Sequence, residues 1–192
     1  GENVVAGTVR SFNKTGNTLT VNQVSERAVI EWQSFNIGKQ ASVNIVQPAS
    51  SSWTVNRVMS RGTDPTQIMG QLKANGNIAV LDQNGVIFGK GSQTDVGSII
   101  VSTGDIDDSS FMNGSNQFTF DAASGSDSNK KTLTGIYQGG TITIKEGGFA
   151  AFVSPWVQNR GTITARLGKI TLASAETFTV DLYGDKLVEL NT

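Results

Sequence analysis

The 192-residue chain contains no histidine and no cysteine. Without histidine it lacks the usual general base at neutral pH, the Ser-His-Asp triad and the commonest zinc ligand. Without cysteine it lacks disulfides, thiol nucleophiles, iron–sulfur clusters and thiolate zinc sites. We therefore expect no enzymatic turnover, no cofactor and no required metal.

Charge is also scarce. Charged residues make up 16% of the chain, below the roughly 25% typical of soluble domains. The net charge is −1, whereas proteins that bind nucleic acid need a basic stripe, so we expect no nucleic-acid partner. No run of about 18 apolar residues is present, so we expect no membrane span. Apolar residues still make up 37%, which argues against a disordered chain.

The two ends of the sequence suggest a piece of a longer chain. It begins at Gly1 without an initiating Met and without a signal-peptide pattern. It ends at Thr192, directly after a strand-like run. We expect one monomeric domain over residues 1–192, which is a fragment of a longer chain.

Most of the chain favours short strands. Runs such as Thr18–Val21 and Ser42–Val46 are rich in β-branched residues and are bounded by Gly, Asn and Ser. One helix is predicted over Asp64–Leu72, with Asp64 as N-cap and Pro65 at the first helical position. The sequence therefore predicts an all-β fold with one short helix.

A repeat of 21 residues is the most informative pattern. The segment that begins at Gly140 resembles the one that begins at Gly161, and Gly76 has the same relation to Gly97. At this offset Phe149–Ala151 aligns with Ile170–Leu172. Units this small cannot bury an apolar face alone, but stacked copies can.

Stacking predicts a parallel β-helix of at most nine coils, each with about three strands. Alternation along the strands should point Thr141 and Thr143 outward, each beside an equivalent Thr one coil later. Four isoleucines should be buried inside: Ile142, Ile144, Ile163 and Ile170. An antiparallel sandwich is the alternative, although it would not require a constant offset.

Two regions interrupt the repeat. Residues 1 to about 35 should cap the N-terminal end of the β-helix, because an open end exposes unpaired backbone. Residues from about 104 to 137 should form an extra-helical hairpin. Its strands would be 118–120 and 133–136, joined by the polar tip 125–131.

Two features raise other kinds of chemistry. The acidic cluster Asp105–Asp108 is a candidate calcium site, but Asp in such loops usually makes local turn bonds. The three tryptophans, Trp32, Trp53 and Trp156, are candidates for a carbohydrate-stacking face, although such residues more often fill corners and caps.

The most conspicuous residues are polar or glycine, and they lie within or directly after strand-like runs. They are Asn56, Arg57, Asn75, Gly76, Asp82, Gln83, Asn84 and Gly85. Asn75-Gly76 and Asn84-Gly85 are typical of tight corners, because both residue types tolerate positive φ. A purely structural role accounts for all eight.

At these residues the sequence resembles the N-terminal secretion domain of two-partner-secretion exoproteins, the filamentous-haemagglutinin N-terminal family. The similar segments are 28–38, 43–48, 56–58, 68–76, 84–85, 95–103, 157–163 and 168–173. The hallmark turn of that family is Asn-Pro-Asn-Gly followed by an apolar residue. Here it reads Asp82-Gln83-Asn84-Gly85-Val86, so its Asn-Pro half is absent.

The resemblance implies a right-handed parallel β-helix with an N-terminal cap and an extra-helical hairpin. It implies a non-enzymatic domain at the N-terminal end of a much longer exported protein. This domain would direct that protein, a large adhesin or haemagglutinin, through the periplasm to the cell surface or medium. The implied partner is an outer-membrane TpsB transporter, which would bind the chain through periplasmic POTRA domains. The eight polar residues would then serve recognition and folding. A carbohydrate-active β-helix enzyme and a ligand-binding module are the alternatives.

Overall fold

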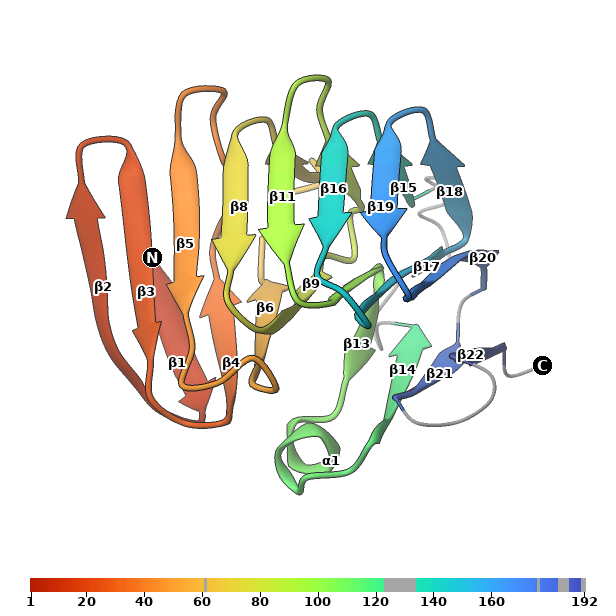
Figure 1. Cartoon of the computed structure of the whole chain (residues 1–192), viewed down its shortest axis with the longest axis horizontal. Helices are drawn as coiled ribbons and strands as arrows, with labels where there is room; N and C mark the ends of the chain where they lie inside the picture. Colours follow the sequence, from red (N-terminus) through yellow and green to blue (C-terminus); the bar gives the residue numbers. More distant parts are fainter. Residues whose placement is uncertain (61, 123–133, 176, 183–186, 191–192) are drawn as a thin grey trace.

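The computed structural model describes residues 1–60, 62–122, 134–175, 177–182 and 187–190. They form a parallel β-helix with three sheets around its axis and a fourth sheet packed outside it (Figure 1). No helix in this described part is long and apolar enough to cross a membrane. The prediction of an all-β parallel β-helix is confirmed.

Three sheets form the walls of the β-helix, and sheet C begins later in the chain than sheets A and B. Sheet A contains β1 (Glu2–Ala6), β4 (Arg27–Trp32), β6 (Trp53–Val58), β9 (Asn77–Leu81), β12 (Ile99–Ser102), β17 (Phe149–Ser154) and β20 (Lys169–Ser174). Sheet B contains β2 (Val9–Thr15), β3 (Thr18–Gln23), β5 (Ser42–Val46), β8 (Gln71–Ala74), β11 (Gln93–Val96), β16 (Thr141–Ile144) and β19 (Thr162–Ala165). Sheet C contains β7 (Thr66–Ile68), β10 (Val86–Phe88), β15 (Gly135–Gln138) and β18 (Trp156–Asn159).

The 21-residue repeat corresponds to one coil. Ile142 pairs with Ile163, and Thr141 and Thr143 pair with Thr162 and Thr164 on the outer surface. Six parallel strands, from β3 to β19, run side by side in sheet B (Figure 1). The predicted ladder of outward threonines is therefore confirmed.

The predicted register fails in sheet A by one residue. Phe149 pairs with Lys169, an offset of 20, so Ile170 lies beside Ala150 and Leu172 beside Phe152. One residue is dropped in the turn that precedes β20. In a β-strand this shift exchanges the two faces, so the predicted pairing of Phe149 with Ile170 is wrong.

Two of the four isoleucines predicted to be buried are fully enclosed. Ile142 is 0% and Ile144 is 3% exposed. Ile163 is partly buried against the same core, whereas Ile170 is 46% exposed. Ile163 and Ile170 are in β19 and β20, each at one end of its sheet, so each has a neighbouring strand on one side only.

The N-terminal end is closed by antiparallel strands. β1 pairs with β4 and β2 pairs with β3, while β3 and β4 pair on their other sides with the parallel strands β5 and β6. Phe12 and Phe35 pack against Trp32 under this end, with ring centroids 5.8 and 5.0 Å apart. The cap thus consists of β1 and β2, and β3 and β4 already belong to the first coil.

The helix predicted over Asp64–Leu72 is wrong. Those residues form β7 and the start of β8. Thr66 and Ile68 are buried beside Val86 and Phe88 of the next coil, so lateral pairing prevails over local helical signals. The helix that does form is α1 (Asp108–Met112), with Asp107 as its N-cap.

An extra-helical unit exists, but it is a sheet of four strands. Sheet D contains β13 (Gly104–Ile106), β14 (Gln117–Ala122), β21 (Phe178–Asp181) and β22 (Val188–Leu190). The predicted pairing of 118–120 with 133–136 is wrong, because β14 pairs with β13 and β21, and β15 belongs to sheet C. The predicted tip, 125–131, and residue 133 lie outside the described residues.

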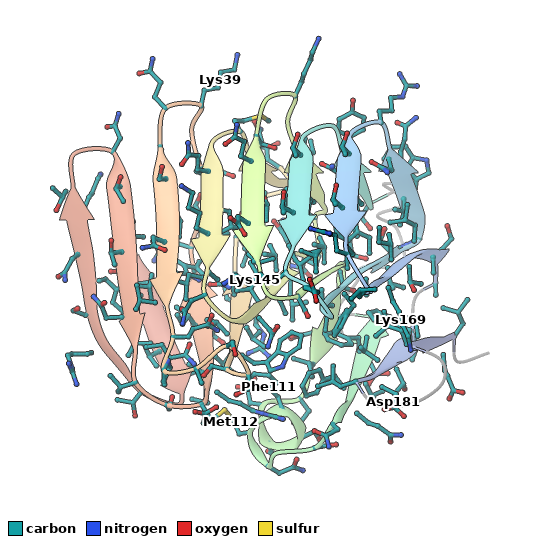
Figure 2. All side chains as sticks on the ribbon, in the orientation of Figure 1. Lys39, Phe111, Met112, Lys145, Lys169 and Asp181 are labelled. Carbon is teal, nitrogen blue, oxygen red and sulfur yellow. The ribbon has the colours of Figure 1, made fainter. Side chains whose placement is uncertain are left out.

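Sheet D creates a second core on the outer face of sheet A. Phe111 of α1, labelled in Figure 2, packs with outward residues of sheet A, including Val55, together with Phe118, Phe120 and Phe178 of sheet D. Because sheet A is buried on both faces, all six residues of β6 and of β17 are buried. This explains why these strands do not show polar–apolar alternation.

Candidate functional site

Asn56 lies inside the β-helix, on the buried middle of β6. Its Oδ1 accepts a hydrogen bond from Trp32 Nε1 at 3.2 Å, and its Nδ2 donates to Ala79 O at 3.3 Å. Its neighbours in the ladder are Ile30 and Val80, and the Asn56 side chain is fully buried. This amide satisfies the indole of the tryptophan under the cap.

Arg57 points to the opposite face of the same strand. Its Nε and Nη2 donate to Asp105 Oδ1 and Asp108 Oδ1, both at 2.7 Å, and Nη2 also donates to Ile106 O at 2.7 Å. Glu31 adds a longer ion pair of 3.6 Å. Burial lowers the pKa of Arg57, but Asp108 and Asp105 raise it by more, so the net shift is upward.

The acidic cluster Asp105–Asp108 therefore serves Arg57 and α1. Asp105 and Asp108 bind the guanidinium, and Asp107 accepts from Ser110 N at 2.9 Å as the helix N-cap. The hydrogen bonds from the backbone and side chain of Ser110 lower the pKa of Asp107. The described part of the chain contains no group of three or more acidic, His or Cys residues that could hold a metal.

Asn75 and Gly76 form a corner between sheets B and A. The Asn75 side chain pairs with the backbone of Gln47 one coil earlier: Nδ2 donates to Gln47 O at 2.8 Å and Oδ1 accepts from Gln47 N at 2.7 Å. Gly76 N donates to Gln47 Oε1 at 2.8 Å. A Cβ at Gly76 would lie 2.8 Å from both Gln47 Oε1 and Ser52 O, so the close approach of two coils requires glycine here.

Gln47 belongs to a buried polar chain that the sequence analysis missed. Its Nε2 donates to Thr54 Oγ1 at 3.0 Å, and Thr54 donates to Gln23 Oε1 at 2.6 Å. Gln23 then donates to Trp53 O at 3.1 Å. The signal in the sequence was a glutamine at the end of β3 and another directly after β5. At such positions one side-chain amide can form hydrogen bonds with polar groups of a neighbouring coil.

Asp82 begins the hallmark turn and is 1% exposed. Its Oδ1 accepts from Asn84 N at 2.9 Å, the side-chain-to-backbone hydrogen bond that Asp commonly makes in turns. Its Oδ2 accepts from Thr66 N at 3.0 Å and Thr66 Oγ1 at 2.7 Å. Burial raises the pKa of Asp82, and these hydrogen bonds oppose that rise.

The rest of the turn combines one exposed side chain with one backbone position at positive φ. Gln83 is exposed. Gly85 has φ of +103°, and a Cβ there would lie 2.5 Å from Gly135 O. Among the described residues, the buried Nδ2 of Asn84 has no hydrogen-bond partner. The prediction of positive φ holds for Gly85 but not for Gly76, Asn75 or Asn84.

These eight residues do not converge on one surface. Asn75-Gly76 and Asp82–Gly85 lie at opposite ends of β9. Arg57 pairs with Leu81, next to Asp82, but its side chain faces sheet D while that of Asn56 faces the interior. The geometry is that of a folding framework, in which each polar group joins neighbouring coils or sheets, rather than of a catalytic pocket.

The tryptophans are also dispersed. Trp32 belongs to the interior core and Trp53 to the second core, each 4% exposed. Trp53 packs against Phe118 with ring centroids 5.3 Å apart. Trp156 is 43% exposed on β18. They do not form a shared stacking face.

Comparison with known proteins agrees with this fold. A family model of the TPS secretion domain matches residues 2–190. A heme/hemopexin-binding protein of Haemophilus influenzae strain Rd is 33% identical over 95% of this chain, and the matching region spans 20% of that protein. A second heme/hemopexin-binding protein of Haemophilus influenzae is 36% identical over 60% of this chain, or 12% of its own length.

A solved structure shows the same architecture. The crystal structure of the HMW1 secretion domain from Haemophilus influenzae superposes with a TM-score of 0.82 and 27% identity. The match covers 98% of this chain and 46% of that one. Domains of this family belong to exoproteins that are secreted across the outer membrane. The chain therefore belongs to the TPS secretion domain family.

Proposed function

We propose that this domain directs a larger exoprotein to its cognate TpsB transporter in the outer membrane and nucleates the folding of that exoprotein outside the cell. Membership of the TPS family supports an exported protein and a transporter partner. The recognition step itself, through periplasmic POTRA domains, is part of the proposal. So is the absence of catalytic turnover and of a cofactor.

The difference between the two ends of the β-helix is the observation that carries this proposal. β1 and β2 cover the N-terminal end with antiparallel strands. At the other end β18, β19 and β20 are the last strands of their sheets. Added coils can therefore continue the parallel pairing of the β-helix from these three strands. Because stability in stacked repeats comes from nearest neighbours, folding would propagate in that direction.

The burial of Asn56 and Asp82 indicates at which stage of folding the transporter would recognise them. Asn56 and Asp82 are 0% and 1% exposed, so a partner cannot contact their side chains in the folded domain. We infer that the transporter binds the chain while it is extended or partly folded, for which strand addition is a natural mode. The same residues would then be enclosed during folding on the cell surface.

The remainder of the proposed exoprotein, its passenger, is not part of the structure described above. The chain spans a fifth or less of the length of the two curated relatives that it matches. Their heme and hemopexin binding is named for the whole proteins. We propose a similar surface exoprotein of the adhesin or haemagglutinin type, without assigning that binding to this domain.

Export of a reporter fused after Thr192 tests the function. With a signal peptide and the cognate transporter, the fusion should accumulate in the medium or on the surface, and without the transporter it should remain in the periplasm. A matched fusion that lacks residues 1–35 should not be exported. Equal export with and without the transporter would contradict the proposal.

A further inference from the structure

Three asparagines in the chain are each followed by glycine: Asn75-Gly76, Asn84-Gly85 and Asn113-Gly114. Such a pair can undergo intramolecular deamidation, because the glycine has no Cβ to hinder attack by its backbone nitrogen on the asparagine side chain. That nitrogen loses its proton and forms a bond to the asparagine Cγ, and the Cγ–Nδ2 bond breaks to release ammonia. Water then opens the cyclic imide to aspartate or isoaspartate, so the only co-reactant is water.

The fold blocks this reaction at Asn75. The attacking nitrogen, Gly76 N, donates its hydrogen to Gln47 Oε1 at 2.8 Å. The side-chain amide is held at both ends, by Gln47 O at 2.8 Å and Gln47 N at 2.7 Å. Attack would require Gly76 N to give up its buried hydrogen bond and Asn75 Nδ2 to give up its bond to Gln47 O.

The fold also blocks the reaction at Asn84. Gly85 N donates to Asp82 O at 2.9 Å within the turn, and Gly85 O accepts from Thr66 N at 3.0 Å. The Nδ2 atom of Asn84 is buried. The attacking group and the leaving group are thus both enclosed between two coils.

Asn113-Gly114 is arranged differently. Both residues are exposed, after the last turn of α1. Among the described residues no hydrogen bond is made by Gly114 N. Ser115 N donates to Asn113 Oδ1 at 2.8 Å, which polarises the amide carbonyl for attack. An added Cβ at Gly114 would meet no atom within 4 Å, so the segment has space to rotate into the cyclic geometry.

We propose that Asn113 is a site of spontaneous deamidation in the folded domain, whereas Asn75 and Asn84 react only while the chain is unfolded. The modification bears on the docking of α1. Arg27 donates to Phe111 O and, at 2.9 Å, to Ser115 O, on either side of Asn113. An isoaspartate adds one backbone carbon between these two acceptors and would disturb the two hydrogen bonds that Arg27 donates to them.

Peptide mapping by mass spectrometry tests the proposal. The purified domain is incubated in mildly alkaline buffer, with a parallel sample in concentrated urea. Folded protein should lose ammonia at Asn113 at least about tenfold faster than at Asn75 or Asn84, since the latter must wait for local opening. In urea the three rates should become similar. Equal rates in the folded protein would overturn the proposal.

Two variants test the cause. Asn113→Gln should remove the fast loss of ammonia at position 113 of the folded domain. Gln47→Ala removes the acceptor of Gly76 N but leaves the backbone partners of Asn75, so it should accelerate reaction at Asn75 and leave Asn113 unchanged. An unchanged Asn75 rate in a folded Gln47→Ala protein would overturn the assigned protection. If circular dichroism shows that this variant unfolds, the wild-type comparison still decides the proposal.

Discussion

Trp32 and Asn56 form a hydrogen bond of 3.2 Å between neighbouring strands inside the β-helix. Asn56→Ala should leave the indole N–H and Ala79 O unpaired in the core, which costs about 1–3 kcal/mol of unfolding free energy for a buried polar group. Urea unfolding of Asn56→Ala, Trp32→Phe and the double variant measures the coupling. The cost of Asn56→Ala should be smaller in the Trp32→Phe background. Equal costs would show that the bond contributes nothing.

Gly85 combines a positive φ with a close approach to Gly135. Gly91 is a matched control, because its φ is +87° and a Cβ there would meet no atom within 4 Å. Gly91→Ala should cost about 1–2 kcal/mol from backbone strain alone. Gly85→Ala should cost distinctly more and should reduce export of the reporter fusion, with the protein retained or degraded in the periplasm. Equal effects at the two sites would refute a role for the close approach.

Asp82 should make stability depend on pH. Its pKa in the folded protein is raised above the ordinary value of 3.8 by burial. As pH rises, the unfolded state therefore releases the Asp82 proton before the native state does. The contribution of protonated Asp82 to the free energy of unfolding is fully present below pH 3.8. It is lost as pH rises through the pKa of Asp82 in the folded protein. Unfolding free energies of wild type and Asp82→Asn, compared across this window, should differ by an amount that changes with pH. A constant difference would contradict the raised pKa.

Ile142 and Ile170 both face the interior of the β-helix but differ in burial, at 0% and 46% exposed. Ile142→Ala should cost about 2–5 kcal/mol as a cavity mutation. Ile170→Ala should cost clearly less, because much of its side chain is already in water. Chemical denaturation of both variants gives the comparison, and equal costs would contradict the assigned burial.

Arg57 should hold sheet D and α1 against the β-helix. Arg57→Lys keeps the charge but loses the planar fork that reaches Asp105 and Asp108 together. We expect a loss of about 2 kcal/mol, typical of hydrogen bonds to charged groups, with faster hydrogen exchange in β13 and α1 than in β9. Uniform exchange changes throughout the chain would argue against a local clamp.

Local spacing was sufficient to predict the β-helix. The threonine rows of β16 and β19 and the pairing of Ile142 with Ile163 follow from a constant offset and strand alternation. The same reasoning failed at β20, since one dropped residue in a turn inverts the faces without altering composition. It also failed at Thr66–Ile68, where pairing with β10 outweighs the helical signals of Asp64 and Pro65.

The sequence pattern singled out candidate residues but not the partners of those residues. The sequence pattern selected Asn56, Arg57 and Asp82, yet their partners lie 16 to 51 residues away: Trp32, Asp108 and Thr66. Gln47 and Thr54 were missed, because the recurrence of glutamine at the ends of β3 and β5 is recognisable only once the bounds of those strands are known. Such partners become apparent only when coils are stacked.

The sequence by itself determined the coil, because the 21-residue repeat and the alternation of apolar residues are local properties that any stacked arrangement must satisfy. Only the tertiary structure decided which surfaces the coils present. Sheet D joins β14 to β21, so Phe120 pairs with Phe178 across two intervening coils. No spacing rule connects those residues, and they meet because the apolar outer face of sheet A must be covered.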